Sequence, residues 1–198
     1  MMELVLASAS PRRRQLLEQS GYKFITSYVK VSEIPQENLN LQEQIEDLAR
    51  QKAQALVESY KSLKKHGILL VSADTVVVLD DQILGKPKTS QEATEVLGQL
   101  SGQKHRVITG VCLWQTEPEK VVTFHETSEV TFRDLSKDEI QAYVDTGDCM
   151  DKAGSYGIQG EAGKFVAKVD GSFDNIVGFP TERFAQVLKE NNWNVARR

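Results

Sequence analysis

The chain has few of the residues that disulfide frameworks and zinc centres require. Its only two cysteines, Cys112 and Cys149, form no CxxC motif in a chain of 198 residues. A disulfide-stabilised secreted domain is therefore not expected, and a reducing compartment is the simple interpretation. The three histidines, at positions 66, 105 and 125, show neither an HExxH motif nor a paired spacing. A zinc site is not expected either.

Long apolar runs and an excess of positive charge are also missing. No segment approaches the roughly 20 apolar residues of a membrane-spanning helix. The N-terminus has neither the basic region nor the long apolar region of a signal peptide. The 24 Lys and Arg against 28 Asp and Glu give a formal net charge of −4. Nucleic acid and acidic membranes usually bind to a basic face, so neither is expected as a partner, and we expect a cytoplasmic protein.

The composition is that of an ordinary globular protein, with 40% hydrophobic and 26% charged residues. The length suits a single domain, residues 1–198, which is large enough to form a core without disulfides. Segments with the pattern of strands and segments with the pattern of helices are mixed along the chain. The predicted fold class is α/β with some α+β character, a central mixed sheet flanked by helices.

Periodicity and capping residues predict the individual elements. Helices are expected to begin after Ser10, at Ser90 acting as a cap, and at the capping box that Ser136 opens. The expected strands are 4–7, 22–29, 68–73, 76–79, 82–84, 106–114, 121–132 and 164–169. The expected helices are 11–19, 41–61, 90–100, 136–145 and 181–191.

The stretch SASPRRRQLL, residues 8–17, places three arginines where a helix begins. Cations in the first turn of a helix are disfavoured by roughly 0.3–1 kcal/mol each, because that end already carries partial positive charge. Either the arginines point into solvent, or an anion binds there. The hydroxyls of Ser8 and Ser10, free backbone N–H groups and a guanidinium fork would suit a phosphate. The loop is not a Walker A motif, since GxxxxGK[ST] does not occur.

Two acidic residues are candidates for catalysis or metal binding. Asp74 directly follows the apolar run ILLVSA, which predicts a carboxylate at the carboxyl end of a buried strand, where open α/β sheets bind ligands. Its partner would be a divalent metal, a lysine or backbone N–H groups, and the alternative is an Asp that caps the next segment. Glu33, in a polar loop, is a second candidate oxygen ligand for Mg²⁺ or Mn²⁺, and a solvated acid is the alternative.

Two lysines and a glutamine complete the candidates. Lys86 stands in the rigid turn LGKP and suits a phosphate contact, although most lysines in turns are simply solvated. Lys52 lies beside the apolar stripe of helix 41–61, from which it reaches a ligand or lies along the surface. Gln159 belongs to the glycine-rich stretch MDKAGSYGIQG, otherwise an ordinary surface loop. Its amide donates and accepts at once, which suits the edge of a pyrimidine.

Six stretches, in this order, resemble the Maf family of nucleoside triphosphate pyrophosphatases. They are LASASPRR, SADT, LGKP, SGQKHRVITGV, DKAGSYGIQG and NIVGFP, and they extend from Leu6 to Pro180. The resemblance implies two lobes around a deep cleft, related to inosine triphosphate pyrophosphatases. It implies hydrolysis of a nucleoside triphosphate to the monophosphate and pyrophosphate with Mg²⁺ or Mn²⁺ as the cofactor. It also suggests a homodimer.

Within this resemblance the catalytic acid corresponds to Asp74, as general base, metal ligand or both. The specificity positions of the branch that prefers dTTP and UTP correspond to Arg12, Thr75 and Gln159. Cys149 stands where the family pattern has a proline, and this departure leaves the named positions intact.

The remaining candidates correspond to the binding of the triphosphate. The helix start, with Ser8, Arg12 and Arg13, resembles a receptor for it, and Lys52 and Lys86 would neutralise the pyrophosphate leaving group. The expected function is cleansing of the nucleotide pool of dTTP, UTP or modified pyrimidine nucleotides. The main alternative is a regulator of cell division and septum formation that binds a partner, with or without catalysis. A further alternative keeps the enzyme and makes 7-methyl-GTP its substrate.

Overall fold

The structure, a computed structural model, describes residues 1–32, 34–36, 38–60 and 67–198. Its strands are β1 (Glu3–Leu6), β2 (Phe24–Thr26), β3 (Ile68–Leu79), β4 (Gln82–Leu84), β5 (Lys104–Thr116), β6 (Glu119–Phe132) and β7 (Val166–Asp170). Its α-helices are α1 (Pro11–Gln19), α2 (Leu41–Ser59), α3 (Ser90–Leu100), α4 (Lys137–Asp145), α5 (Phe173–Val177) and α6 (Thr181–Glu190). Two short 3₁₀ helices, η2 (Ala153–Ser155) and η3 (Glu161–Phe165), precede β7.

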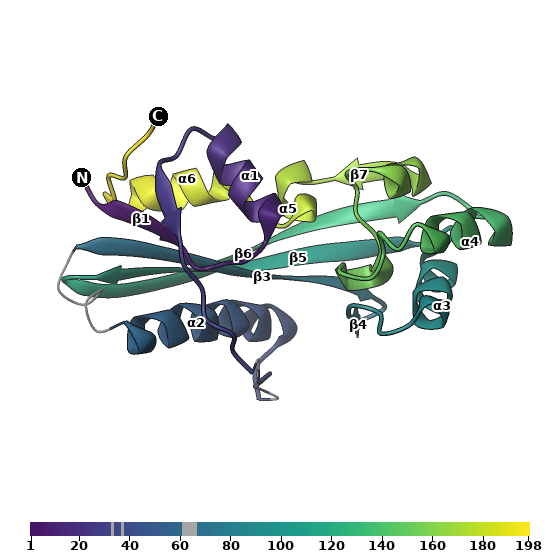
Figure 1. Ribbon diagram of the computed structural model, residues 1–198, viewed down its shortest axis with the longest axis horizontal. Coiled ribbons are helices and arrows are strands. Elements are labelled where there is room, and N and C mark those ends of the chain that lie inside the picture. The colour runs from purple at the N-terminus through teal and green to yellow at the C-terminus, as the bar shows by residue number, and fades with distance from the viewer. Residues whose placement is uncertain (33, 37, 61–66) are drawn as a thin grey trace. The chain divides into compact units, whose positions relative to one another are not determined.

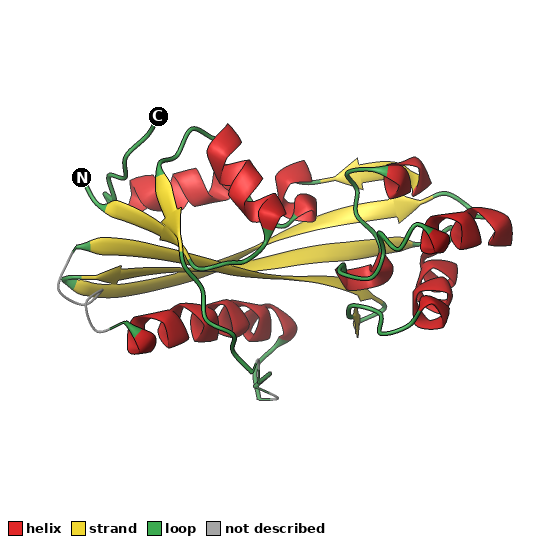
Figure 2. Cartoon of the chain, viewed as in Figure 1, coloured by secondary structure: helices red, strands yellow, loops and turns green. Residues whose placement is uncertain are grey.

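The strands form one mixed sheet. Among the described residues it has seven strands, in the order β2-β1-β3-β5-β6-β7, with β4 paired to β3 outside this path. β1 runs parallel to both β2 and β3, whereas β3–β4 and β6–β7 are antiparallel pairs. Figure 2 shows the strands in yellow with helices beside them. The predicted fold class, a mixed sheet flanked by helices, is confirmed.

The chain divides into two compact units. Unit 1 comprises Met1–Asp74, Thr109–Glu126 and Gly178–Arg198, and unit 2 comprises Thr75–Ile108 and Thr127–Val177. β3, β5 and β6 each contribute residues to both units. The prediction of a single domain over residues 1–198 stays a prediction.

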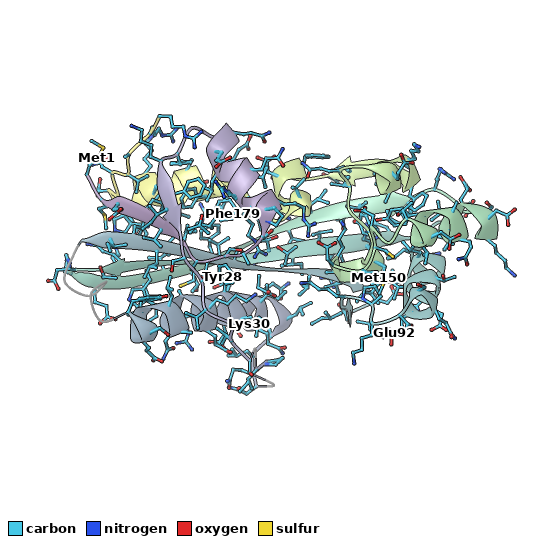
Figure 3. The ribbon with its side chains drawn as sticks, viewed as in Figure 1. Met1, Tyr28, Lys30, Glu92, Met150 and Phe179 are labelled. Carbon is cyan, nitrogen blue, oxygen red and sulfur yellow. The ribbon has the colours of Figure 1, made fainter. Side chains whose placement is uncertain are left out.

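In unit 1, helices cover both faces of the sheet: α2 lies on one face, and α1 and α6 lie on the other (Figure 1). Under α2, Val5, Leu56 and Leu70 are fully buried and belong to one apolar cluster. On the other face, Phe184 of α6 meets Tyr22 and Phe179 edge to face, each pair with ring centroids 5.2 Å apart. Phe179, labelled in Figure 3, is fully buried. Such pairs add about 0.5–1.5 kcal/mol beyond the burial of their apolar area.

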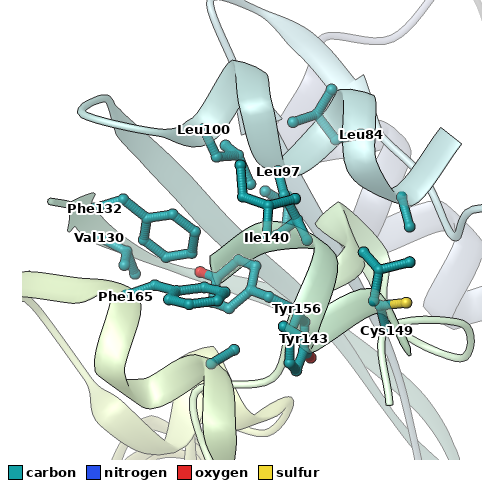
Figure 4. Packing of buried hydrophobic residues seen from close by; sticks show 14 of the residues in the cluster. Leu84, Leu97, Leu100, Val130, Phe132, Ile140, Tyr143, Cys149, Tyr156 and Phe165 are labelled. Carbon is teal, nitrogen blue, oxygen red and sulfur yellow. The ribbon is translucent and has the colours of Figure 1, made fainter. Parts of the chain in front are cut away.

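Unit 2 has its own core, built around aromatic rings. Phe132 of β6 meets Tyr156 at 4.8 Å and Phe165 at 5.9 Å between centroids, and both contacts are edge to face. Leu97 of α3 and Ile140 of α4 belong to the same cluster of buried residues (Figure 4). This core supports the glycine-rich segment that carries Gln159.

Most predicted elements are confirmed, and some differ, including β3, which is described with the active site. β2 has three residues, Phe24–Thr26, rather than the eight of the predicted strand 22–29. The residue that caps α3 is Thr89 instead of Ser90, because the Thr89 hydroxyl accepts the N–H of Glu92 at 3.1 Å. α5 lies in a segment for which the sequence predicts no regular element, because its five residues are too few to show helical periodicity.

Candidate active site

The connection between β1 and α1 folds around the hydroxyl of Ser8. Ser8 Oγ accepts the backbone N–H of Ser10 at 3.2 Å and Nη1 of Arg13 at 3.3 Å. Ser10 is the N-cap of α1, and its hydroxyl accepts the N–H of Arg13 at 3.5 Å. Pro11 follows at a position where a missing N–H costs nothing. The predicted cap is confirmed, and Ser8 lies at the helix start as expected.

The three arginines of α1 have different surroundings. Arg14 is exposed and pairs with Glu18 one turn later at 3.1 Å, which matches the solvated alternative. Arg13 donates through Nε to the carbonyl of Gly178 at 2.9 Å, in addition to its bond with Ser8. Arg12 is half-buried in the same first turn. Arg13 therefore fastens the start of α1 to the segment that precedes α6.

Gly178 is a contributor that sequence reasoning missed. It belongs to the stretch NIVGFP, which carries the family resemblance but no predicted role. Its carbonyl accepts from a residue 165 positions away, and no local pattern encodes that partner. The only signal in the sequence was the stretch itself.

Asp74 and Lys52 form an ion pair within unit 1. Lys52 Nζ lies 2.5 Å from Asp74 Oδ1, and the two side chains are 20% and 13% exposed. Of the partners that the sequence allowed for Asp74, the lysine is therefore present. At this degree of burial, removing either partner leaves a poorly solvated charge, so the pair is held as a unit.

The alternation of β3 explains how Asp74 reaches Lys52. Ser72 and Asp74 are two residues apart and face the same side of the strand. Ser72 Oγ donates to the carbonyl of Ala49 on α2 at 2.6 Å. Ala49 and Lys52 are three residues apart on that helix and therefore lie on one face. Two contacts one turn apart thus fix the helix against the strand.

Small residues let α2 approach the sheet closely. Ala49 and Ala53 are fully buried and pack against Cys112 of β5. A Cβ added to Gly110, also on β5, would lie 2.5 Å from the backbone oxygen of Ile45. Burial raises the pKa of the Cys112 thiol to about 12, so the thiol stays protonated and serves as a packing group. This close approach places Lys52 within reach of Asp74.

The prediction that a strand ends at Asp74 is wrong. β3 continues for 12 residues from Ile68 to Leu79, and Asp74 lies in its middle. β3 pairs with β1 over Ile68–Val71 and with β4 over Val77–Leu79, and Asp74 lies between these stretches. The ion pair with Lys52 offsets the cost of placing a carboxylate inside a strand. The predicted strands 76–79 and 82–84 are confirmed as an antiparallel pair.

Unit 2 carries the other predicted site residues. Thr75 follows Asp74 on β3 and faces the opposite side of the strand, because successive side chains alternate. Lys86 is exposed in the turn after β4, and Gln159 is exposed before η3. The two segments are joined, since the N–H of Gly154 donates to the carbonyl of Gly85 at 3.1 Å.

The described residues contain no cluster of three or more His, Cys, Asp or Glu side chains that could hold a metal ion. Glu33, the second predicted metal ligand, lies outside the described residues. Asp74 supplies one carboxylate oxygen donor. This donor set fits Mg²⁺ bound mainly through substrate, since Mg²⁺ in nucleotide sites uses one or two carboxylates together with phosphate oxygens and water.

Comparison with known proteins decides the family. A family model described as "Maf-like protein" matches residues 3–191. The chain belongs to the Maf family. A protein of Bdellovibrio bacteriovorus named dTTP/UTP pyrophosphatase is 48% identical over 187 residues, which cover 94% of this chain and 97% of that protein.

Two further relatives of this Maf protein carry the same name. The dTTP/UTP pyrophosphatase of Symbiobacterium thermophilum is 43% identical, with 96% of this chain and 94% of that protein covered. The one from Aliivibrio fischeri is 42% identical, with 95% and 97% covered. The resemblance inferred from six motifs is confirmed. Among the described residues of this Maf protein, no helix has both the length and the apolarity needed to span a membrane.

Proposed function

We propose that this Maf protein hydrolyses dTTP and UTP to the nucleoside monophosphate and pyrophosphate, and so removes these or modified pyrimidine nucleotides from the nucleotide pool. The observation that carries the proposal is the Lys52–Asp74 pair at 2.5 Å. The carboxylate lies in the middle of a strand, where a lysine from a closely packed helix holds it in place. The fold does not require such a group, so we interpret it as preorganised for chemistry. The names of the relatives support the substrate class.

Asp74 is the group that we assign to the activation of water. Lys52 orients the carboxylate, which accepts a proton as the water oxygen attacks the α-phosphorus. The bond between the α-phosphorus and the bridging oxygen then breaks, and pyrophosphate leaves. Lys52 and Lys86 neutralise the charge that develops on this leaving group. Positive side chains act most strongly where such charge grows in the transition state.

The start of α1 is assigned to the triphosphate. The Ser8 hydroxyl, Arg12 and Arg13 lie at this helix start, and the first turn of α1 contains no acidic residue. Arginines that oppose the helix dipole become favourable once a phosphate occupies the site. Thr75 and Gln159 are assigned to the base, where the Gln159 amide both donates and accepts.

A divalent cation, Mg²⁺ or Mn²⁺, is the cofactor that the donor set suits. Asp74 would hold it, with Glu33 as the second carboxylate. When bound, the ion would supply Lewis-acid stabilisation of the phosphate oxygens. The residues of the chain orient the substrate and move the proton, as described above.

Wider properties of the protein follow from the same proposal. We place it in the cytoplasm, where its substrates are made, as a single Maf domain over residues 1–198, which the family match to 3–191 supports. The net charge of −4 supports a small anionic substrate bound in a local basic site rather than nucleic acid. The homodimer stays a prediction.

The proposal is tested by measuring pyrophosphate release from a panel of nucleotides. The panel contains dTTP, UTP, CTP, ATP, GTP and 7-methyl-GTP, each with Mg²⁺ or Mn²⁺. We expect dTTP and UTP to be cleaved to monophosphates with higher kcat/KM than the others. Turnover of 7-methyl-GTP alone would keep the chemistry but remove the roles of Arg12 and Gln159. No release from any nucleotide would contradict the proposal and favour a partner-binding regulator.

A further inference from the structure

A buried hydrogen bond fastens the glycine-rich segment that carries Gln159. The Tyr156 hydroxyl and Nε2 of His105 are 2.8 Å apart. Tyr156 is 5% exposed and His105 is 2% exposed. His105 lies on β5, whereas Tyr156 lies in the irregular segment between η2 and η3. The bond therefore joins a regular strand to a segment without ladder hydrogen bonds of its own.

Both partners of this bond are uncharged at neutral pH. Burial lowers the pKa of His105 to about 4 and raises the pKa of Tyr156. The two rings also meet edge to face at 5.4 Å, and both contact Phe132. In Figure 4 the Tyr156 ring lies inside the cluster of apolar side chains. A neutral pair in such surroundings makes a hydrogen bond for which water does not compete.

The backbone beside Tyr156 adopts a conformation that its neighbours must impose. Gly154 and Ser155 have φ values of 66° and 60°, and a left-handed conformation is uncommon for serine. A Cβ on Gly154 would lie 2.8 Å from the Val77 side chain, so the segment is pressed against β3. A conformation of this kind persists only where surrounding contacts over-determine it. The bond to His105 is one such contact.

The proposed role of Gln159 requires this rigidity. Uracil and thymine present an acceptor at O4, whereas cytosine presents a donor at N4. A glutamine amide that turns freely offers its donor or its acceptor and therefore fits either base. Discrimination requires that the segment hold the amide in one orientation. Gln159 is itself exposed, so its backbone must be held in place by buried neighbours. Tyr156, only three residues away, is such a neighbour.

We propose that the His105–Tyr156 hydrogen bond holds Gln159 in the orientation needed to select uracil and thymine over cytosine. His105 and Tyr156 are thus positioning residues for base selection, and neither touches the substrate. This inference rests on the proposed function, because it assigns the specificity of that same site.

The first test is the variant Tyr156→Phe, which removes one oxygen and keeps the ring and its packing. The measurement is kcat/KM for UTP and for CTP. We expect the preference for UTP over CTP to fall roughly threefold to tenfold, the factor that one hydrogen bond typically contributes. KM for UTP should rise while kcat stays within about twofold, because base contacts bind ground state and transition state alike. Lower stability alone would reduce the active fraction and change both substrates equally.

Tyr22→Phe is the matched control. Tyr22 is also buried, its hydroxyl accepts Arg197 Nη2 at 2.8 Å, and its ring meets Phe184 edge to face. It lies in unit 1 and has no part in the proposed site. This variant should keep the UTP to CTP preference of the wild type. Hydrogen exchange should show faster exchange in residues 153–160 only for Tyr156→Phe.

His105→Gln and His105→Leu separate the hydrogen bond from packing. The glutamine amide reaches the position of Nε2 and should retain the wild-type preference, whereas leucine should reproduce Tyr156→Phe. If His105→Leu fails to fold, Tyr156→Phe and its exchange pattern still decide. An unchanged preference and unchanged exchange in Tyr156→Phe would overturn the inference while leaving the proposed function intact. A wild type that cleaves neither UTP nor dTTP would overturn both.

Discussion

At the scale of single residues, His105 is a titratable side chain that the fold holds away from water. It is almost fully buried between Phe132 and Tyr156, and burial lowers its pKa to about 4 from an ordinary value of 6.5. The folded protein therefore holds the neutral ring under conditions in which the unfolded chain binds a proton. Stability must depend on pH in that interval.

Folding stability is expected to fall as the pH is lowered from 6.5 towards 4. Because the folded pKa lies below the unfolded one, the contribution of His105 is complete above pH 6.5. It is lost progressively down to about pH 4, by roughly 3 kcal/mol in total. Urea unfolding at several pH values measures this change. His105→Gln should be less stable at pH 7, but its free energy of unfolding should lack the loss that His105 causes between pH 6.5 and 4. If the free energies of unfolding of the two proteins ran parallel over this pH range, His105 would not be the group responsible.

The sequence predicts the chemistry of single residues better than their partners. The cap at Ser10 follows from a local pattern and is confirmed, and a lysine is one of the partners that the sequence allowed for Asp74. The bond from Arg13 to Gly178 and the bond from His105 to Tyr156 join positions 165 and 51 residues apart. Such pairs depend on how strands and helices pack, which no local spacing encodes.

At the scale of elements, the contact of α2 with the sheet determines the geometry of the Lys52–Asp74 pair. The helix approaches β5 so closely that Gly110 leaves no room for a Cβ against the backbone of Ile45. Backbone cannot move aside as a flexible side chain can. The distance between helix and sheet is therefore set by the absence of one methyl group.

Gly110→Ala should destabilise the protein by about 1–3 kcal/mol, because the new methyl forces α2 outward. It should also lower activity, since Lys52 moves with the helix. Gly98→Ala is the control, because Gly98 lies within α3 with nothing near its missing Cβ. Alanine there should stabilise by about 0.5–1 kcal/mol and leave activity unchanged. Urea unfolding and pyrophosphate release measure both effects. Equal stability of the two variants would show that the close approach is unimportant.

Element boundaries show where local rules are overridden. A polar Asp-Thr pair after an apolar run usually marks the end of a strand, yet β3 continues through it. Pairing with β1 before Asp74 and with β4 after it provides ladder hydrogen bonds on both sides. Lys52 then compensates the carboxylate. Tertiary partners of this kind are absent from the pattern of the strand itself.

At the scale of the whole molecule, the candidate residues are distributed over both units. Ser8, Arg13, Lys52 and Asp74 belong to unit 1, whereas Lys86 and Gln159 belong to unit 2. The alternation of apolar runs and helical periods was sufficient to predict a mixed sheet flanked by helices. The division into units was not predictable in detail, because it cuts through β3, β5 and β6, and the sequence predicts uninterrupted strands for the last two.

The most direct test of the account is the rate of pyrophosphate release from dTTP by Asp74→Asn compared with the wild type. Asparagine keeps the shape and can still accept from Lys52, but it cannot take a proton from water. Asp81→Asn is the control. Asp81 lies on the turn that follows β3, and its carboxylate pairs with Arg106 at 2.6 Å. We predict a loss of about 10²–10⁴-fold for Asp74→Asn and none for Asp81→Asn. Wild-type rates in a folded Asp74→Asn protein would contradict the central claim.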